Sequence, residues 1–353
     1  MKRIETLIII AFFSIALSVC LGPAQAGAES MRGVELVVVL ENSRVVAQSD
    51  PDGERFEALS ILVDLMDPAD LIGAVRFARE AAVIRELSWK GTGGLGAELL
   101  KDLSENSSEN RDRDLEKALS AALGLFEVGE NASDVPKRAV VIIGSGRIDV
   151  GSEDENEKSR NRIFSEILPR YEKSGIPVYA IGVGREQNVE LIEAIGSLSD
   201  GFHFSLESPH GFSSAAIDIF NDIKHLDIAP LEGLSFRIGE NVEEALIVAN
   251  GGGMNDEKCG LLSPTRIFYR KDKNSDEISW SGHKKYNIIR LYKPEAGRWN
   301  LHSRADHNCV VFLDSARRIK FRTPRKLMFH DENIVVAAYL DQGGRMVQNP
   351  QIL

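Results

Sequence analysis

The sequence predicts an α/β domain, with a doubly wound, mostly parallel sheet flanked by helices, followed by an all-β sandwich. Between residues 34 and 226, short apolar segments alternate with amphipathic ones, which is typical of strands and helices in turn. Two of the short segments, residues 36–40 and 139–143, are continuously apolar, as strands are when helices cover both faces of a sheet. After residue 227 the helical periodicity stops, and short β-like segments separated by turn residues indicate a second domain.

The first domain is expected at residues 34–227, where strands and helices follow one another. Strands are expected at residues 34–40, 71–77, 81–87, 138–143, 178–183 and 202–204, and helices at 54–66, 97–105, 114–128, 159–174, 189–197 and 211–224. Segment 81–87 follows segment 71–77 so closely that we expect a hairpin partner at the sheet edge. A polar loop is expected at residues 41–53, and two further polar loops, at residues 104–113 and 151–161, are expected to be exposed.

The second domain is expected at residues 228–330. Short strands are expected at residues 235–238, 245–249, 266–270, 286–292, 299–303, 309–313 and 319–321, a spacing that indicates an antiparallel sandwich of immunoglobulin type. Trp299 lies between polar Arg298 and Asn300, so we expect its ring in the sandwich core. Residues 331–353 are expected to form a C-terminal β segment, which is either a final hairpin or the start of a truncated further domain.

The first 26 residues have the pattern of a secretory signal peptide. Lys2 and Arg3 precede the apolar run 7–21, and Ala24-Gln25-Ala26 fits the small-x-small pattern of a cleavage site. The run is shorter than the roughly 20 residues that a membrane-spanning helix needs. We therefore expect a mature chain without a transmembrane span, in the periplasm or secreted.

Charge and cysteine content narrow the partners and the redox compartment. The formal net charge is −11 and the basic residues are scattered, which argues against nucleic acid as a partner. Of the three cysteines, Cys20 lies in the signal segment and Cys259 and Cys309 remain. An even pair in an oxidising compartment predicts a disulfide between Cys259 and Cys309.

Several motifs in the first domain resemble the von Willebrand factor type A (VWA) family, in its bacterial secreted or periplasmic members. They are DPDGERFEA at residues 50–58, DLIGAVRF at 70–77 and SGIPVYAIGVG at 174–184, and they occur in the order that the family has. The resemblance implies a metal-ion-dependent adhesion site at the carboxyl ends of the strands. In the family, an Asp and two Ser of a DxSxS loop, a later Thr and a later Asp provide the ligands.

The resemblance implies that this metal site is degenerate here. The positions that correspond to the family's ligands are Glu41, Ser43, Val45, Arg113 and Ser145. Val45 has no side-chain oxygen, and Arg113 brings a permanent positive charge. Mg²⁺ requires a set of oxygen ligands. We therefore expect no cofactor, and a guanidinium of Arg113 near Glu41 in place of the metal.

The resulting expectation is a non-catalytic, extracytoplasmic protein-binding or scaffold protein, and not an enzyme. Its binding residues for an acidic protein partner are expected to be Arg44, Arg113 and Arg147. Two alternatives stay open. One is a metal-dependent VWA adhesion protein with a variant Mg²⁺ site formed by Glu41, Ser43, Ser145 and either Asp114 or Asp149. The other is an uncharacterised hydrolase, although Gly144-Ser145-Gly146 lacks the GxSxG spacing of a nucleophile elbow.

Overall fold

The first domain is built on a six-stranded sheet. The computed structural model describes residues 33–91, 95–104, 111–127, 137–185, 187–250, 259–271, 274–283, 285–302, 309–315, 317–322, 337–342 and 345–346. Within these ranges the strand order is β3-β2-β1-β4-β5-β6. The strands are β1 (Val34–Glu41), β2 (Leu71–Phe77), β3 (Ala81–Trp89), β4 (Lys137–Gly144), β5 (Val178–Val183) and β6 (His203–Leu206). Only β3 runs antiparallel to its neighbour in this sheet, so the predicted edge hairpin is confirmed.

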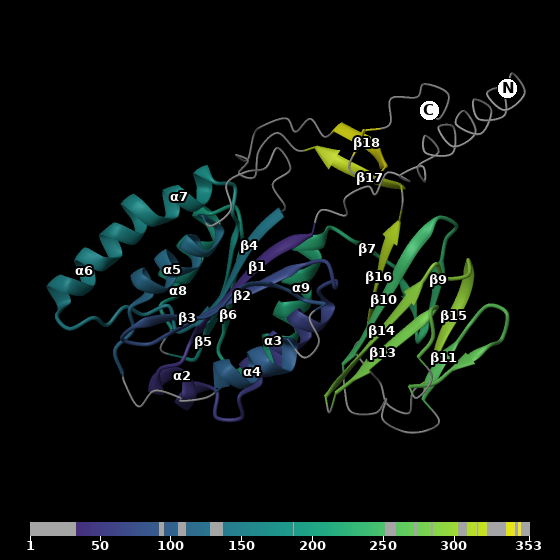
Figure 1. Ribbon diagram of the computed structural model, residues 1–353, viewed down its shortest axis with the longest axis horizontal. Coiled ribbons are helices and arrows are strands. Elements are labelled where there is room, and N and C mark those ends of the chain that lie inside the picture. The colour runs from purple at the N-terminus through teal and green to yellow at the C-terminus, as the bar shows by residue number, and fades with distance from the viewer. Residues whose placement is uncertain are drawn as a thin grey trace, which may run out of the picture.

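Helices cover both faces of this sheet (Figure 1). One face carries α3 (Glu54–Leu65), α4 (Leu95–Ser104) and α9 (Phe212–Lys224). The other carries α5 (Leu115–Glu127), α7 (Leu168–Lys173) and α8 (Val189–Leu198). Successive side chains of a strand point to opposite faces, so β1 contributes Leu36 and Leu40 to the first core and Val37 and Val39 to the second. The predicted doubly wound α/β architecture is confirmed.

A helix begins at Glu153, within the stretch 151–161 that was expected to be an exposed loop. Helix α6 (Glu153–Arg162) starts at a capping box. Ser152 Oγ accepts a hydrogen bond from the N–H of Glu155 at 3.3 Å, and the Glu155 carboxylate accepts one from the N–H of Ser152 at 3.1 Å. This S-x-x-E pattern is a helix start signal that is present in the sequence, although the polar composition of the segment is typical of a loop.

Helix α6 continues into α7 through a π-helical turn at Ile163–Ile167. Pro169 has no N–H with which to continue the normal i→i−4 hydrogen bonds. The N–H of Leu168 bonds to the carbonyl of Ile163, five residues earlier. The turn therefore has a local cause in the sequence.

The second domain consists of two antiparallel sheets. Their orders are β13-β14-β10-β16-β7 and β12-β11-β15-β9-β8. The strands are β7 (Asp227–Ile228), β8 (Leu231–Glu232), β9 (Ser235–Ile238), β10 (Val242–Asn250), β11 (Gly260–Leu262), β12 (Phe268–Tyr269), β13 (Ile278–Gly282), β14 (Tyr286–Tyr292), β15 (Gly297–His302) and β16 (Cys309–Ser315). Ile247, Ile289 and Trp299 lie in the core between the two sheets, which confirms the prediction for Trp299.

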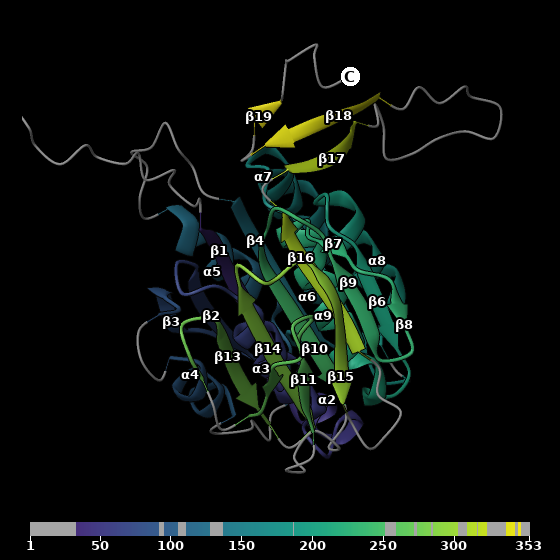
Figure 2. The same ribbon diagram turned by 90° about the vertical axis from the view of Figure 1, so that its right-hand side faces the viewer.

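The second domain lies against the helices α3 and α9 of the first (Figure 2). The sheet that contains β10, β14 and β16 faces these helices. Its residues Leu246, Ile288 and Phe312 belong to the same buried cluster as the side chains of α3 and α9. The two domains therefore share one continuous apolar core at this contact.

A third sheet follows the sandwich. The strand expected at residues 319–321 was assigned to the sandwich, and this assignment is wrong. Strand β17 (Arg317–Arg322) pairs with β18 (Ala337–Gln342), which also pairs with β19 (Arg345–Met346). Because β17 finds its partner later in the chain, alternation of apolar and basic residues alone could not assign it to a sheet.

The disulfide expected between Cys259 and Cys309 is a further correction, because these two described cysteines form none. Cys259 precedes β11 in one sheet of the sandwich, and Cys309 begins β16 in the other. Both pack with the apolar sandwich core. Burial raises the pKa of the Cys309 thiol to about 12, which disfavours the thiolate that disulfide exchange requires.

The predicted signal peptide, residues 1–26, lies outside the described residues. Across the ranges that are described, none of the helices is both long and apolar enough to cross a bilayer.

Candidate functional site

The candidate site lies where the loops after β1, β4 and β5 meet. These strands are neighbours in the sheet, and their carboxyl ends lie at the same edge. The N–H of Asn188, after β5, donates to the carbonyl of Ser145, after β4, at 2.8 Å. Gly184 has φ 91°, and a Cβ there would lie 2.5 Å from Ser49 Oγ in the loop after β1. The three loops are thus in direct contact.

The carboxylate of Glu41 is the centre of this site. Glu41 ends β1 and is fully buried. Its Oε1 accepts a hydrogen bond from Ser43 Oγ at 2.5 Å. Its Oε2 accepts from the N–H of Ser145 at 2.6 Å and from Ser145 Oγ at 2.9 Å. A Cβ on Gly144 would lie 2.6 Å from Oε2, so the carboxylate occupies space that only a glycine leaves open.

Burial raises the pKa of Glu41 above its ordinary value of 4.5. The hydrogen bonds from Ser43 and Ser145 oppose this shift, and so does the positive charge of Arg113, whose effect is the smallest of these. Desolvation outweighs all of them, because a carboxylate removed from water loses more hydration than three donors restore. The site therefore favours a neutral Glu41 more than water does.

Arg113 forms its closest contacts with Asp149 and not with Glu41. The two residues exchange backbone hydrogen bonds at 2.8 and 3.0 Å, and a guanidinium nitrogen lies 3.2 Å from Asp149 Oδ2. The Arg113 side chain is 9% exposed. Its charge still acts on Glu41, as the pKa of that residue indicates. The structure thus brings Arg113 into the site, as expected, but bonds it to a different carboxylate.

The loop after β1 contains a short helix that the sequence was not expected to form. Helix α2 (Arg44–Ser49) includes Val45, and Ser43 is its N-cap, because Ser43 Oγ accepts from the N–H of Val46 at 3.4 Å. Ser43 therefore serves both Glu41 and the helix.

The carboxylates considered for a variant metal site have other partners. Asp114 accepts a hydrogen bond from the N–H of Lys117 at 2.9 Å and pairs with the Lys117 ammonium at 3.2 Å, as a cap of α5. Asp149 pairs with Arg113. In the part of the chain that the structure describes, no three His, Cys, Asp or Glu residues gather in a metal-binding arrangement.

Each of the three loops that form the site contains an exposed arginine. Arg44 and Arg147, both expected from the sequence, lie in the loops after β1 and β4. Arg185 lies in the loop after β5 and was missed. The available signal was its position two residues after Val183, where β5 ends. Each of three neighbouring strand ends therefore has one exposed arginine near it.

Ser145, the serine that was compared with a nucleophile elbow, lies within this site. Among described atoms, Ser145 Oγ contacts the Glu41 carboxylate and the N–H of Arg147. His210 lies 3.3 Å from Glu54, a residue of α3.

Comparisons with known proteins agree with this architecture. The family model described as von Willebrand factor type A domain matches residues 35–215. A search of curated proteins found no match. Similar solved structures include a von Willebrand factor type A protein from Catenulispora acidiphila, with 10% identity and a TM-score of 0.43 over 82% of this chain and 60% of that one.

Two further similar structures each cover a little over half of this chain. One is an aerotolerance-related membrane protein from Bacteroides fragilis, with 21% identity and a TM-score of 0.39 over 55% of this chain and 100% of that one. The other is the PilB minor pilin from Streptococcus sanguinis, with 11% identity and a TM-score of 0.41 over 57% of this chain and 63% of that one. This chain spans about 60% of the length of the Catenulispora protein. Since the family match extends over just over half of the chain, the protein belongs to the von Willebrand factor type A domain family.

Proposed function

We propose that this chain is a non-catalytic protein-binding or scaffold protein that acts outside the cytoplasm. Its VWA domain would contact the partner through the loops after β1, β4 and β5, without a divalent metal. Membership of the VWA family supports the protein-binding role. The signal-like pattern of residues 1–26 supports the location.

The proposal of metal independence rests on the hydrogen bonds that Glu41 accepts from other residues of the site. Both remaining hydroxyls of the inherited site, on Ser43 and Ser145, donate to the Glu41 carboxylate. Mg²⁺ would need these oxygens as ligands at short, uniform distances. It would also have to bind a carboxyl group whose pKa burial raises, next to the permanent charge of Arg113. The donor set therefore does not fit the metal that the family uses.

The exposed arginines support an acidic partner surface. Arg44, Arg147 and Arg185 are exposed, each in one of the three loops that form the site. Guanidinium groups bind carboxylates in a planar, two-pronged geometry. Arg113 is held by Asp149, so we expect it to support the loop and Arg44 and Arg147 to contact the partner.

Titration calorimetry with Mg²⁺, Mn²⁺ and Ca²⁺ tests metal independence. We expect no micromolar binding to residues 27–353. Micromolar binding that Glu41→Ala abolishes would overturn this part of the proposal. It would favour the metal-dependent alternative that uses Glu41, Ser43, Ser145 and either Asp114 or Asp149.

Capture of a partner from envelope extract tests the binding surface. We expect equal capture with and without EDTA, and weaker capture by the Arg44→Glu/Arg147→Glu double variant. Arg298→Glu is the matched control, because Arg298 is 57% exposed and lies in the sandwich, away from the site. Capture that EDTA removes, or that the double variant leaves unchanged, contradicts the proposal.

The non-catalytic role has its own test. Purified protein is assayed against a panel of ester, peptide, phosphate and glycoside substrates. Turnover that Ser145→Ala abolishes would favour a hydrolase instead.

A further inference from the structure

The contact between the two domains is made by a sheet of the sandwich that is buried on both faces. Strands β10, β14 and β16 send one set of side chains into the sandwich core and the alternate set onto α3 and α9. Phe312 of β16 packs edge-on against Phe220 of α9, with ring centroids 5.6 Å apart. The apolar contact is thus as continuous as a domain interior.

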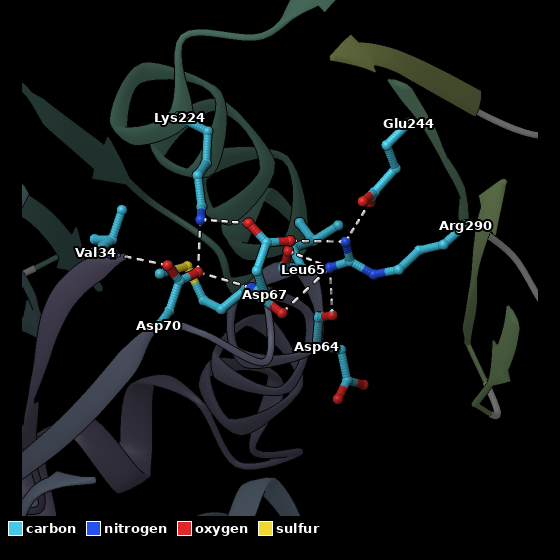
Figure 3. A network of polar contacts seen from close by, with 9 residues as sticks. Val34, Asp64, Leu65, Asp67, Asp70, Lys224, Glu244 and Arg290 are labelled. Atoms are coloured by element: carbon cyan, nitrogen blue, oxygen red, sulfur yellow. Dashed lines mark hydrogen bonds and ion pairs between the residues drawn. The ribbon is translucent and has the colours of Figure 1, made fainter. Parts of the chain in front are cut away.

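Arg290 of β14 crosses this contact and ends at the carboxyl terminus of α3 (Figure 3). One guanidinium nitrogen donates to the carbonyls of Leu65, Met66 and Asp64, at 2.5, 3.2 and 3.3 Å. The last carbonyls of a helix lack partners within the helix and carry its negative dipole end. A guanidinium from the sandwich therefore caps a helix of the VWA domain.

The other guanidinium nitrogen of Arg290 joins carboxylates from both domains. It lies 3.0 Å from Asp67, which follows α3, and 2.5 Å from Glu244 of β10. The Arg290 side chain is 9% exposed. Burial would raise the pKa of Asp67, but Lys224 and Arg290 together lower it below its ordinary value of 3.8. The ion pairs thus outweigh the desolvation of this carboxylate.

Lys224 extends this network to α9 and to the sheet. Its ammonium lies 2.6 Å from Asp67 and 2.6 Å from Asp70. Asp70 also accepts a hydrogen bond from the N–H of Val34, at the start of β1, at 2.7 Å. Lys224 is the last residue of α9. Through Asp67, Arg290 is connected to the ends of α3 and α9 and to the first strand.

A second polar contact holds α3 further along its length. The Tyr286 hydroxyl lies 2.6 Å from Ser60 Oγ and donates to Asp64 at 2.9 Å. His283 lies 2.7 Å from the same Asp64 carboxylate. The sandwich is therefore bonded to two successive turns of α3.

We propose that Arg290 is an interdomain latch that makes the VWA domain and the sandwich one cooperative unit. Helix α3 begins directly after the candidate site, where Asp50 accepts a hydrogen bond from the N–H of Glu54 at 2.8 Å. The same helix ends at Arg290. A displacement of α3 that starts at the candidate site has to break the latch or move the sandwich with it. The latch does not depend on what the candidate site binds.

The test compares Arg290→Leu with Arg298→Leu in residues 27–353. Arg298 is also an arginine of the sandwich with an acidic partner, Glu232, but both side chains are largely exposed. Calorimetry and hydrogen exchange followed by mass spectrometry report the unfolding of each domain. We expect one transition for the unsubstituted chain and for Arg298→Leu. We expect two transitions for Arg290→Leu, with exchange in β10, β14 and the end of α3 faster by on the order of a hundredfold.

A single transition for Arg290→Leu, or two transitions for the unsubstituted chain, would overturn the proposal. If Arg290→Leu does not fold, Arg290→Lys is measured by hydrogen exchange. Lysine keeps the positive charge but lacks the planar guanidinium that donates hydrogen bonds from two terminal nitrogens. Faster exchange on both sides of the contact then supports the latch. Exchange equal to that of the unsubstituted chain refutes it.

Discussion

Replacing Glu41 by glutamine should remove a pH-dependent loss of stability. Glutamine keeps an acceptor for the N–H and Oγ of Ser145 and can donate to Ser43 Oγ, so it imitates the neutral acid. In the native protein the pKa of Glu41 is raised above 4.5 by burial. The folded chain therefore holds this proton more tightly than the unfolded chain does.

The sign of the effect follows from proton linkage. The favourable contribution of neutral Glu41 is fully present below pH 4.5 and is lost as pH rises through the folded pKa. Within that window, the free energy of unfolding of the unsubstituted chain should fall relative to Glu41→Gln by up to about 1.4 kcal/mol per pH unit. Above the folded pKa the difference should become constant.

Urea denaturation at half-unit steps from pH 4 to 8 measures this difference. Asp149→Asn is a useful control, because it changes a carboxylate of the same site that is 38% exposed. Parallel stability curves for the unsubstituted chain and Glu41→Gln would refute the reasoning, since they would mean that Glu41 titrates alike in both states. A curve that diverges in the opposite direction would mean that Glu41 is stabilised as a carboxylate.

Three further predictions concern the packing of the molecule. Phe312→Ala should lower the free energy of unfolding by about 3–5 kcal/mol, because Phe312 is 1% exposed between the domains. The control Ile267→Ala, at a residue that is 50% exposed, should change the free energy of unfolding by less than about 0.5 kcal/mol. Similar losses for the two variants in urea denaturation would contradict this prediction. Asp50→Asn should cost about 3–5 kcal/mol, because the buried Arg55 guanidinium loses the negative charge that pairs with it at 2.7 Å. A cost below about 1 kcal/mol would contradict this. Cys309 should react with iodoacetamide at pH 8 much more slowly in the native than in the urea-unfolded chain, because its pKa is about 12; equal rates would be inconsistent with burial.

The first domain was predictable because its signals are local. Continuous apolar segments such as residues 36–40 identify strands covered on both faces, and the hairpin at β2 and β3 follows from the short connection. The signal for the start of α6 is equally local, because it is the cap formed by Ser152 and Glu155. The polar composition of the segment, however, is also typical of a loop. The pairing of β17 with β18 could not be predicted in this way, because the residue pattern of a strand does not indicate which other strand it pairs with.

The residues of the candidate site were predictable, but their contacts were not. Alignment with the family's motif identified Glu41, Ser43 and Ser145 as neighbours, and the structure joins them by hydrogen bonds. The same reasoning assigned Arg113 to Glu41, whereas its guanidinium bonds to Asp149. A motif gives the position of a residue at the end of a strand. Which of two carboxylates its side chain then bonds to depends on side-chain geometry.

The order of apolar and polar residues alone determined that this chain forms a helix-covered sheet and then a sandwich. Apolar residues recur once per turn in a helix and at every second residue in a strand, so their spacing marks the face that each element buries. The tertiary structure alone decided which groups satisfy Glu41, whose partner Ser145 is 104 positions away. It also decided that Arg290 caps α3 across 225 positions of sequence. Such contacts depend on how two elements pack against each other. The spacing of apolar residues within either element carries no information about a partner so far away in the sequence.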